Sequence, residues 1–366
     1  LPPASSGVVE QLAARRSSVR AFAPRSMPLQ ILADLLRAAY GIVEITPLFT
    51  IDDTVEEAPD MRVYTPLELA GRIPPSKQRQ LAVEVMKAIG FPFDRGRLDE
   101  SEHPFTGGAP GDIRITTRFI PNEPLSGLMG VLHEMGHAMY EVGLPEAWRG
   151  QPVGRDRGMA VHESQSLLLE MLICRNRPFL KYLRPLLERI GGVSGPEWEV
   201  ENLYRLLTRV RRSLIRVDAD EVTYTVHIML RYELEKEILD GTLKVQDVPE
   251  AWNERIHDRL GVRPSNDAEG CLQDVHWATG SFGYFPSYSI GAVIAGQLYE
   301  TLRSERPELD EEIAAGYFAG LFEWLRQNIH SHGARLSTPE LIQNATGRPL
   351  TAAAWLRYAE AKYLEE

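Results

Sequence analysis

The chain has 366 residues, of which 43% are hydrophobic and 25% charged, a composition typical of a soluble globular protein with one large domain or two smaller ones. Its formal net charge of −11 argues against nucleic acid as a partner, because phosphate binding requires a basic surface. No apolar stretch reaches membrane-spanning length, and the first residues lack the charged-then-apolar order of a signal peptide. Only two cysteines occur, which favours a reducing compartment, and we expect a cytoplasmic protein without a membrane partner.

The first part of the sequence is unevenly patterned. Helix-forming patterns cover residues 8–16 and 29–39, separated by a bend at Pro24 and Pro28. Residues 45–75 have little hydrophobic periodicity and are rich in Pro, Asp and Glu, which predicts a linker or a loosely ordered segment.

From residue 76 onward the pattern becomes regular and mostly helical. Residues 78–90 predict a helix that ends at a glycine, and the alternating, β-branched run at 112–119 predicts a strand. Further amphipathic helices are predicted at about 126–142, 160–174, 197–214, 219–239, 249–259, 288–303, 310–329 and 352–364. We therefore expect a mostly α fold with a small β-sheet near the functional site.

The strongest chemical signal is the run His-Glu-Met-Gly-His at residues 133–137. Two imidazoles four residues apart, here His133 and His137, lie on one face of a helix and can bind one metal ion. Glu134 lies beside them and can accept a proton. Glu163 is the candidate third ligand, which leaves the fourth tetrahedral position to water, as in catalytic zinc sites. The pattern indicates a zinc peptidase.

An alternative is that the two histidines lie on a solvated helix face and bind no metal. The helical context argues against this, because Ser126 can cap the start of the helix and Gly143 can end it. An apolar stripe with i, i+4, i+7 and i+11 spacing consists of Leu128, Leu132, Met135 and Met139. The two histidines fall on the opposite side of the helix from this stripe.

Several separate motifs follow one another along the chain. They are His-Pro-Phe at 103–105, Asp-Ile-Arg-Ile-Thr at 112–116, His-Glu-x-x-His at 133–137, His-Glu-Ser-Gln at 162–165, Ile-Arg-Val-Asp-Ala-Asp at 215–220 and Gly-Cys-Leu-Gln-Asp-Val-His-Trp at 270–277. In this order they resemble the motifs of the Taq-type metallocarboxypeptidases, a zinc-peptidase family, over about residues 74–366. The resemblance implies a zincin-like helical peptidase fold with the N-terminal part of the family fold missing. It also implies a homodimer, because the family's members are usually dimeric.

The resemblance assigns roles to the residues of the metal site. It implies that His133, His137 and Glu163 bind zinc, with cobalt as an alternative metal, and that Glu134 is the general base. Glu170, two turns beyond Glu163, remains the rival third ligand. His162, next to Glu163, is expected not to share the helix face of that ligand.

Two arginines match positions that the family associates with substrate recognition. Arg216 and Arg114 are the candidates for binding the C-terminal carboxylate of a peptide, for which the planar arginine fork is well suited. Each has an alternative role in an ion pair, for example with Asp220 or Asp112. Of the two, Arg216 is the stronger candidate.

Hydrolysis also requires donors that stabilise the oxyanion of the tetrahedral intermediate. By analogy with the related peptidases, His276 and Tyr288 are the candidates, with Tyr284 as the alternative tyrosine. The other interpretation of these residues is a buried histidine packed among aromatic rings.

Residues 8–43 resemble a different family, the opening of the flavin-dependent nitroreductases. The remaining flavin-binding segments of that fold are absent, so no flavin is predicted. We expect a fusion or chimera with three parts: a nitroreductase-like fragment at 1–43, a linker at 44–73 and a metallocarboxypeptidase domain at 74–366.

The resulting functional hypothesis is a zinc-dependent carboxypeptidase that removes the C-terminal residue of peptides with broad specificity. The first alternative is an endo-acting zinc oligopeptidase. The second is a catalytically inactive metal-binding remnant of a fusion.

Overall fold

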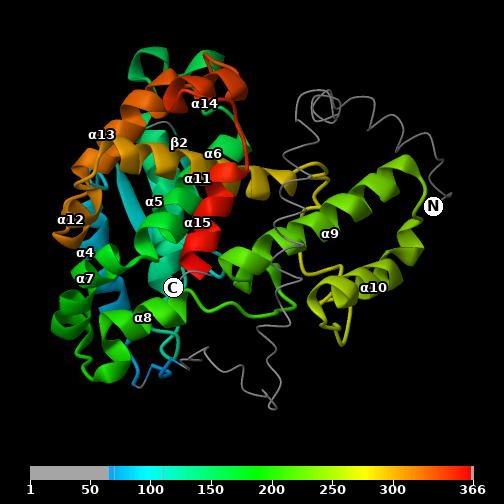
Figure 1. The fold of residues 1–366 in the computed structure, drawn as a ribbon, viewed down its shortest axis with the longest axis horizontal. Helices are drawn as coiled ribbons and strands as arrows, with labels where there is room; N and C mark the ends of the chain where they lie inside the picture. Colours follow the sequence, from blue (N-terminus) through cyan, green and yellow to red (C-terminus); the bar gives the residue numbers. More distant parts are fainter. Residues whose placement is uncertain (1–65, 70, 110, 364–366) are drawn as a thin grey trace. The chain divides into compact units, whose positions relative to one another are not determined.

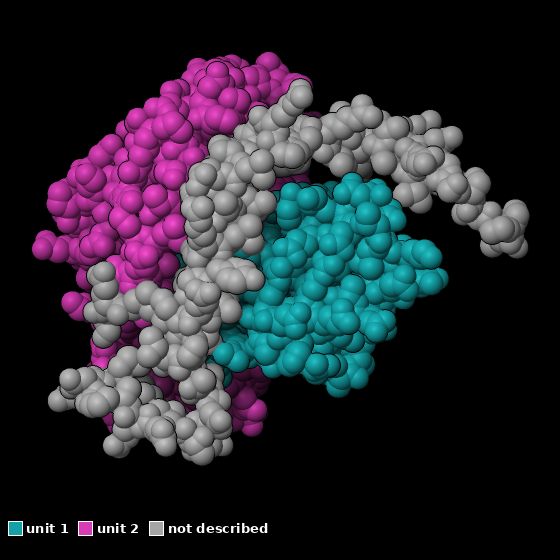
Figure 2. Space-filling view, turned by 45° about the vertical axis from the view of Figure 1, so that its right-hand side comes forward, with its two compact units in different colours: residues 1–52, 210–286 teal, residues 53–209, 287–366 magenta. Residues whose placement is uncertain are grey.

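The computed structural model describes residues 66–69, 71–109 and 111–363. These residues fall into two compact units, which have different colours in Figure 2. Unit 1 contains Val210–Pro286, and unit 2 contains the described residues up to Arg209 and from Ser287 onward.

Some of the sequence-based predictions lie outside the described residues. These are the helices at 8–16 and 29–39, the nitroreductase-like segment at 8–43 and most of the linker at 44–73. The two units divide the segment 74–366 that the sequence predicts as one catalytic domain.

A three-stranded sheet forms in unit 2 (Figure 1). Its strands are β1 (Gly96–Glu100), β2 (Phe105–Ala109) and β3 (Asp112–Thr117). The order is β1-β3-β2, with β1 parallel and β2 antiparallel to the central strand. The strand predicted at 112–119 is confirmed as β3, which ends two residues earlier, at Thr117. The sequence does not predict β1 and β2, because both are short and a Gly-Gly pair interrupts the alternation in β2.

Helices make up most of the rest of unit 2. They are α4 (Pro75–Ile89), α5 (Ser126–Gly143), α6 (Met159–Leu167), α7 (Arg177–Leu186), α8 (Val200–Leu207), α11 (Pro286–Glu305), α12 (Leu309–Ala314), α13 (Ala319–Asn328), α14 (Thr338–Thr346) and α15 (Ala353–Tyr363). A π-helical segment, Leu168–Cys174, continues α6. The predicted fold class, mostly α with a small sheet, is confirmed. Among the described residues, no helix is both long and apolar enough to cross a membrane.

Two predicted helices extend further than those observed. The helix predicted at 197–214 ends at Leu207. The helix predicted at 310–329 is divided into α12 and α13 by Gly316, whose φ of 79° lies in the left-handed region that side chains disfavour. Hydrophobic periodicity continues across both interruptions, so periodicity alone cannot locate them.

Helix capping differs from expectation at two helix starts. Ser126 is the first residue of α5 rather than its cap, and its side chain makes no capping bond; Leu125 holds the N-cap position. Helix α14 is not among the predicted helices, although Ser337 and Glu340 form a capping box at its start. The Ser-x-x-Glu spacing was therefore a usable signal for this helix.

Helix α5 is the central helix of unit 2 and contacts α4, α6, β2 and β3. The predicted apolar stripe is confirmed, since all of its members are buried: Leu128, Leu132, Met135 and Met139. The stripe therefore packs into the core and leaves the other face of α5 for polar groups.

Helix α6 approaches α5 closely at Gly136. A Cβ atom at this position would lie 2.3 Å from the carbonyl oxygen of Gln165 and 2.4 Å from the Cα atom of Ser166. On another side, α11 meets α6 at Gly291, where a Cβ atom would lie 2.7 Å from the Cβ atom of Glu163. Glycines on two neighbouring helices thus allow α6 to bring Glu163 close to α5.

Unit 1 is built on two helices, α9 (Glu221–Asp240) and α10 (Val248–Leu260). Asp220 caps α9 by accepting hydrogen bonds from the backbone N–H groups of the first turn. The two helices enclose a hydrophobic cluster that includes Trp252 and Leu234, and Cys271 joins it from the segment that follows α10.

We expect Gly136→Ala to lower the free energy of unfolding by about 1–3 kcal/mol, because the added methyl group meets the backbone of α6 and the helices must separate. At an open helical position the same change would stabilise by about 1 kcal/mol, so a loss identifies the close contact. Urea unfolding measures the difference. Ser126→Ala, in the same helix but without a capping bond, is the control and should change stability by less than about 0.5 kcal/mol. Equal stabilities of the two variants would contradict the prediction.

Candidate metal centre

The structure brings His133, His137 and Glu163 together in unit 2. One donor atom from each residue lies within 4.8 Å of the other two. Oε2 of Glu163 is 3.8 Å from Nε2 of His133 and 3.9 Å from Nε2 of His137. These separations suit donors that share one ion at about 2 Å, the usual distance of nitrogen and oxygen ligands from zinc.

The surroundings of Glu163 also suit a cation. The residue is 4% exposed, and burial raises the pKa of its carboxyl group. A buried carboxylate is stable only when a cation or several donors compensate its charge. Two imidazole nitrogens and one such carboxylate form a donor set that zinc and other borderline metals accept.

The Nδ1 atom of His133 is engaged on the side away from Glu163. It lies 2.9 Å from Oε2 of Glu170, whose other oxygen accepts a 2.6 Å hydrogen bond from Arg175. Burial opposes protonation of His133, but the bond to Glu170 and its charge outweigh burial and raise the pKa of the imidazole to about 9. Glu170, predicted as the rival ligand, therefore bonds to Nδ1 of His133, the ring nitrogen that does not face Glu163. Carboxylates commonly occupy this position behind a metal-binding histidine.

The Nδ1 atom of His137 is engaged in a similar way. It lies 2.6 Å from Nδ1 of His162, and Nε2 of His162 lies 3.0 Å from Oε1 of Glu141. A consistent proton arrangement has His162 donating to Glu141 and His137 donating to His162, which leaves Nε2 of His137 as an electron-pair donor. His162, on α6, thus contributes to the site through its contacts with His137 and Glu141 on α5. Its position next to Glu163 in the sequence did not predict these contacts.

Glu134, the candidate general base, contacts the sheet. Oγ1 of Thr106, on β2, lies 2.6 Å from Oε2 of Glu134 and 2.9 Å from its backbone oxygen. Glu134 is 7% exposed, and its charge acts on both His133 and Glu163, which places its carboxyl group near the candidate ligands.

The residues that support these groups are not predicted from the sequence. Glu141 was within reach of sequence reasoning, because it lies four residues after His137 and therefore on the same helix face. Thr106 and Arg175 carry no comparable local signal, because their contacts depend on how the sheet and the π-helical segment meet α5.

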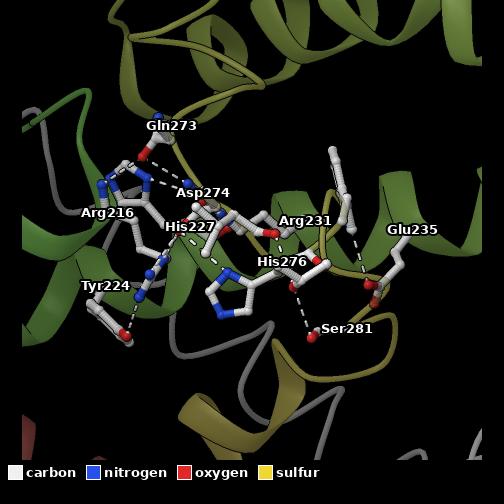
Figure 3. A network of polar contacts seen from close by, with 12 residues as sticks. Arg216, Tyr224, His227, Arg231, Glu235, Gln273, Asp274, His276 and Ser281 are labelled. Atoms are coloured by element: carbon white, nitrogen blue, oxygen red, sulfur yellow. Dashed lines mark hydrogen bonds and ion pairs between the residues drawn. The ribbon is translucent and has the colours of Figure 1, made fainter. Parts of the chain in front are cut away.

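In unit 1, Arg216 and Arg231 share the carboxylate of Asp274 (Figure 3). Nε and Nη2 of Arg216 donate to Oδ1 over 2.9 and 2.7 Å, and Nε of Arg231 donates to Oδ2 over 2.6 Å. Burial opposes ionisation of Asp274, but the two guanidinium groups outweigh it and lower the pKa of the carboxyl group. The ion pair suggested for Arg216 with Asp220 is not among the ion pairs of the described residues, and Asp220 instead caps α9.

Arg114 makes the ion pair that the sequence analysis considered. Its Nη2 atom donates to Oδ2 of Asp112 over 2.7 Å, and both side chains are about half exposed. An exposed pair of this kind contributes little to stability.

The candidate oxyanion residues belong to different units. In unit 1 the ring of His276 packs 4.4 Å from that of Phe285 and 5.2 Å from that of Tyr284, so the aromatic packing considered as an alternative is present. Burial lowers the pKa of His276, which keeps the imidazole neutral. Tyr288 lies in the first turn of α11.

Comparisons with known proteins agree on one family. The family model of the Carboxypeptidase Taq (M32) metallopeptidases matches residues 41–363 of this chain. Carboxypeptidase 1 of Bacillus subtilis is 40% identical over 291 residues, covering 79% of this chain and 58% of the relative. Thermostable carboxypeptidase 1 of Thermus thermophilus is 41% identical, with 79% and 57% covered. The chain thus spans less than two thirds of the length of these curated relatives.

Solved structures give the same result. Metallocarboxypeptidase 1 of Trypanosoma cruzi superposes with a TM-score of 0.80 at 37% identity, covering 99% of this chain and 70% of that protein. The M32 carboxypeptidase of Deinococcus radiodurans superposes with a TM-score of 0.82 at 37% identity, covering 92% and 66%.

Glu235 supplies a pH-dependent prediction for unit 1. It is 3% exposed, accepts a 3.1 Å hydrogen bond from Nε1 of Trp277, and has its pKa raised by burial from 4.5 to about 7. The unfolded chain therefore loses this proton at a lower pH than the folded protein. The contribution of Glu235 to stability should be fully present below pH 4.5 and fall as the pH rises to about 7, by on the order of 3 kcal/mol.

Urea unfolding of Glu235→Gln between pH 4.5 and 8 tests this prediction. The amide cannot ionise, so the variant should be more stable than the unsubstituted protein at pH 8 and similar to it at pH 4.5. Glu254→Gln, an exposed position on α10, is the control and should keep the original pH dependence. A parallel pH dependence in all three proteins would contradict the raised pKa.

Proposed function

The chain belongs to the Carboxypeptidase Taq (M32) metallopeptidase family, and from this premise we propose that it is a zinc-dependent carboxypeptidase with broad specificity for peptides. The observation that carries the proposal is the arrangement around Glu163. Two imidazole Nε2 atoms face its carboxylate at 3.8 and 3.9 Å, with the carboxyl group of Glu134 in the same buried region.

His133, His137 and Glu163 would hold the metal ion, zinc or alternatively cobalt. When bound, such an ion polarises the scissile carbonyl group and makes water more acidic. The bonds of Nδ1 of His133 to Glu170 and of Nδ1 of His137 to His162 support this assignment, because they orient both Nε2 atoms toward Glu163.

Glu134 would accept a proton from the attacking water and deliver it to the amine of the departing residue. General acid–base catalysis of this kind contributes about 10²–10⁴-fold to the rate. The position of Glu134 on α5, directly beside His133, supports the role.

Arg216 would bind the C-terminal carboxylate of the substrate, with Arg114 as the second candidate. The guanidinium group of Arg216 is buried and donates to Asp274 and to the hydroxyl group of Tyr224, which hold it in one orientation. A planar guanidinium group in a fixed orientation is suited to bidentate binding of a carboxylate.

His276 and Tyr288 would donate hydrogen bonds to the oxyanion of the tetrahedral intermediate. Burial lowers the pKa of His276, which favours the neutral imidazole; one ring nitrogen of that form still has an N–H group that can donate.

The test compares one peptide as free acid and as C-terminal amide, with products identified by mass spectrometry. We expect stepwise loss of single residues from the free acid only. In Glu134→Gln, turnover should fall by about 100-fold or more while the metal content is retained. Internal cleavage of both forms would support the oligopeptidase instead. Absence of cleavage with metal retained would indicate an inactive metal-binding protein.

The metal ligands are tested by replacing each of the two rival carboxylates, Glu163 and Glu170, in a separate variant. Glu163→Gln and His137→Ala should lose stoichiometric metal after dialysis. Glu170→Gln should still bind one equivalent with affinity reduced by about 10–100-fold, because it removes an outer partner. Elemental analysis and competition with a chelator measure both quantities. Loss of metal in Glu170→Gln with retention in Glu163→Gln would reverse the assignment.

Three further proposals concern the protein as a whole. We propose a cytoplasmic protein, supported by two free, buried cysteines, Cys174 and Cys271, and testable by cell fractionation. We propose a homodimer, by resemblance to the family, which light scattering would test.

Residues 8–43 are proposed as a nitroreductase-like fragment joined to the peptidase; they are largely outside the family match that begins at residue 41. Normal turnover and stability after removal of residues 1–40 would support this proposal, and loss of either would oppose it.

A further inference from the structure

The carboxylate of Glu134 has one hydrogen-bond donor among the residues that the structure describes, the hydroxyl group of Thr106. Thr106 belongs to β2, at one edge of the sheet, and pairs with Ile115 of the central strand. Glu134 lies in the middle of α5. The contact therefore ties the proposed general base to the sheet rather than to its own helix.

The hydroxyl group has one proton and two acceptors within reach. Oε2 of Glu134 is 2.6 Å away and the backbone oxygen of Glu134 is 2.9 Å away. A separation of about 2.5–2.7 Å is typical of a hydroxyl group that donates to a charged carboxylate. A carbonyl oxygen inside a helix already accepts from the N–H group four residues later. The proton of Thr106 therefore belongs on the bond to Oε2.

This bond decides how the carboxylate is oriented. The terminal torsion of a glutamate is broad and has no strongly preferred value. A donor fixed in the sheet and bonded to Oε2 selects one orientation of the carboxylate plane. Because Oε2 is bonded to the hydroxyl group of Thr106, Oε1 is the oxygen that can exchange protons with the reactants.

We propose that Thr106 is a positioning residue, whose hydroxyl group holds the carboxylate of Glu134 in the orientation required for proton transfer. The inference rests on the proposed function, in which Glu134 is the general base. Thr106 itself touches neither substrate nor metal in this assignment. It acts through Glu134 alone.

The sheet offers a matched control at Thr117. This residue, on β3, also donates its hydroxyl proton to a carbonyl oxygen of α5, that of Gly127, over 3.0 Å. It is fully buried and has no contact with Glu134 among the described hydrogen bonds. Thr117 therefore shares with Thr106 the docking of sheet to helix, but not the contact with the base.

The experiment compares Thr106→Val, Thr106→Ser and Thr117→Val, all loaded with metal. Valine keeps the shape of threonine and removes the hydroxyl group. We expect Thr106→Val to lower kcat by about 10–100-fold with KM changed by less than about twofold, because the base is misoriented but binding is not. Metal stoichiometry and affinity should be unchanged. Thr106→Ser should recover most of kcat, and Thr117→Val should keep the original kcat.

Several results would overturn the role of Thr106. Equal losses of kcat in Thr106→Val and Thr117→Val would reduce both residues to docking contacts. Weakened metal binding in Thr106→Val, or no recovery of kcat in Thr106→Ser, would show that Thr106 does not act by orienting Glu134. Thr106→Ala replaces the valine variant if that variant does not fold. Absence of hydrolysis by the unsubstituted protein would refute the proposed function as well, whereas an unchanged kcat in Thr106→Val would refute only the inference.

Discussion

The close packing of α6 against α5 at Gly136 is the constraint on which the candidate metal centre depends. The two histidines on α5 are set by helix geometry alone, but Glu163 reaches them only if the helix backbones nearly touch. A Cβ atom at Gly136 would lie 2.3 Å from a carbonyl oxygen of α6, so a larger residue here would displace the third donor. The glycine inside the His-Glu-x-x-His run is therefore as important to the geometry as the residues with functional side chains.

Charge compensation distinguishes the two carboxylates that compete for the role of third ligand. Glu170 already has two partners, Arg175 and His133, which outweigh burial and lower its pKa to about 2. For Glu163 burial is the dominant effect, and its pKa is raised. A cation would relieve the cost of ionising Glu163, whereas Glu170 is stable as a carboxylate without one. Electrostatics and geometry thus favour the same assignment.

The sequence predicts features that depend on local spacing, and it fails for those that depend on contacts between distant segments. The extent of α5, its buried stripe and the pairing of His133 with His137 follow from the 3.6-residue period of a helix. The edge strand β2 has no such pattern, and Thr106 reaches Glu134 only because β2 pairs with β3 and the sheet packs on α5. The same limit applies to Arg216, whose partner Asp274 is 58 residues away.

The arginine motif illustrates how one residue can satisfy both a structural and a functional interpretation. Arg216 is buried and bonded to Asp274 and Tyr224, as a purely structural arginine would be. Arg231 donates to the other oxygen of the same carboxylate. Arg231 is fully buried, and burial, the largest effect, lowers its pKa to about 10 despite Asp274. The proposed carboxylate recognition is compatible with the burial of Arg216, because the bonds to Asp274 fix the orientation of its guanidinium group.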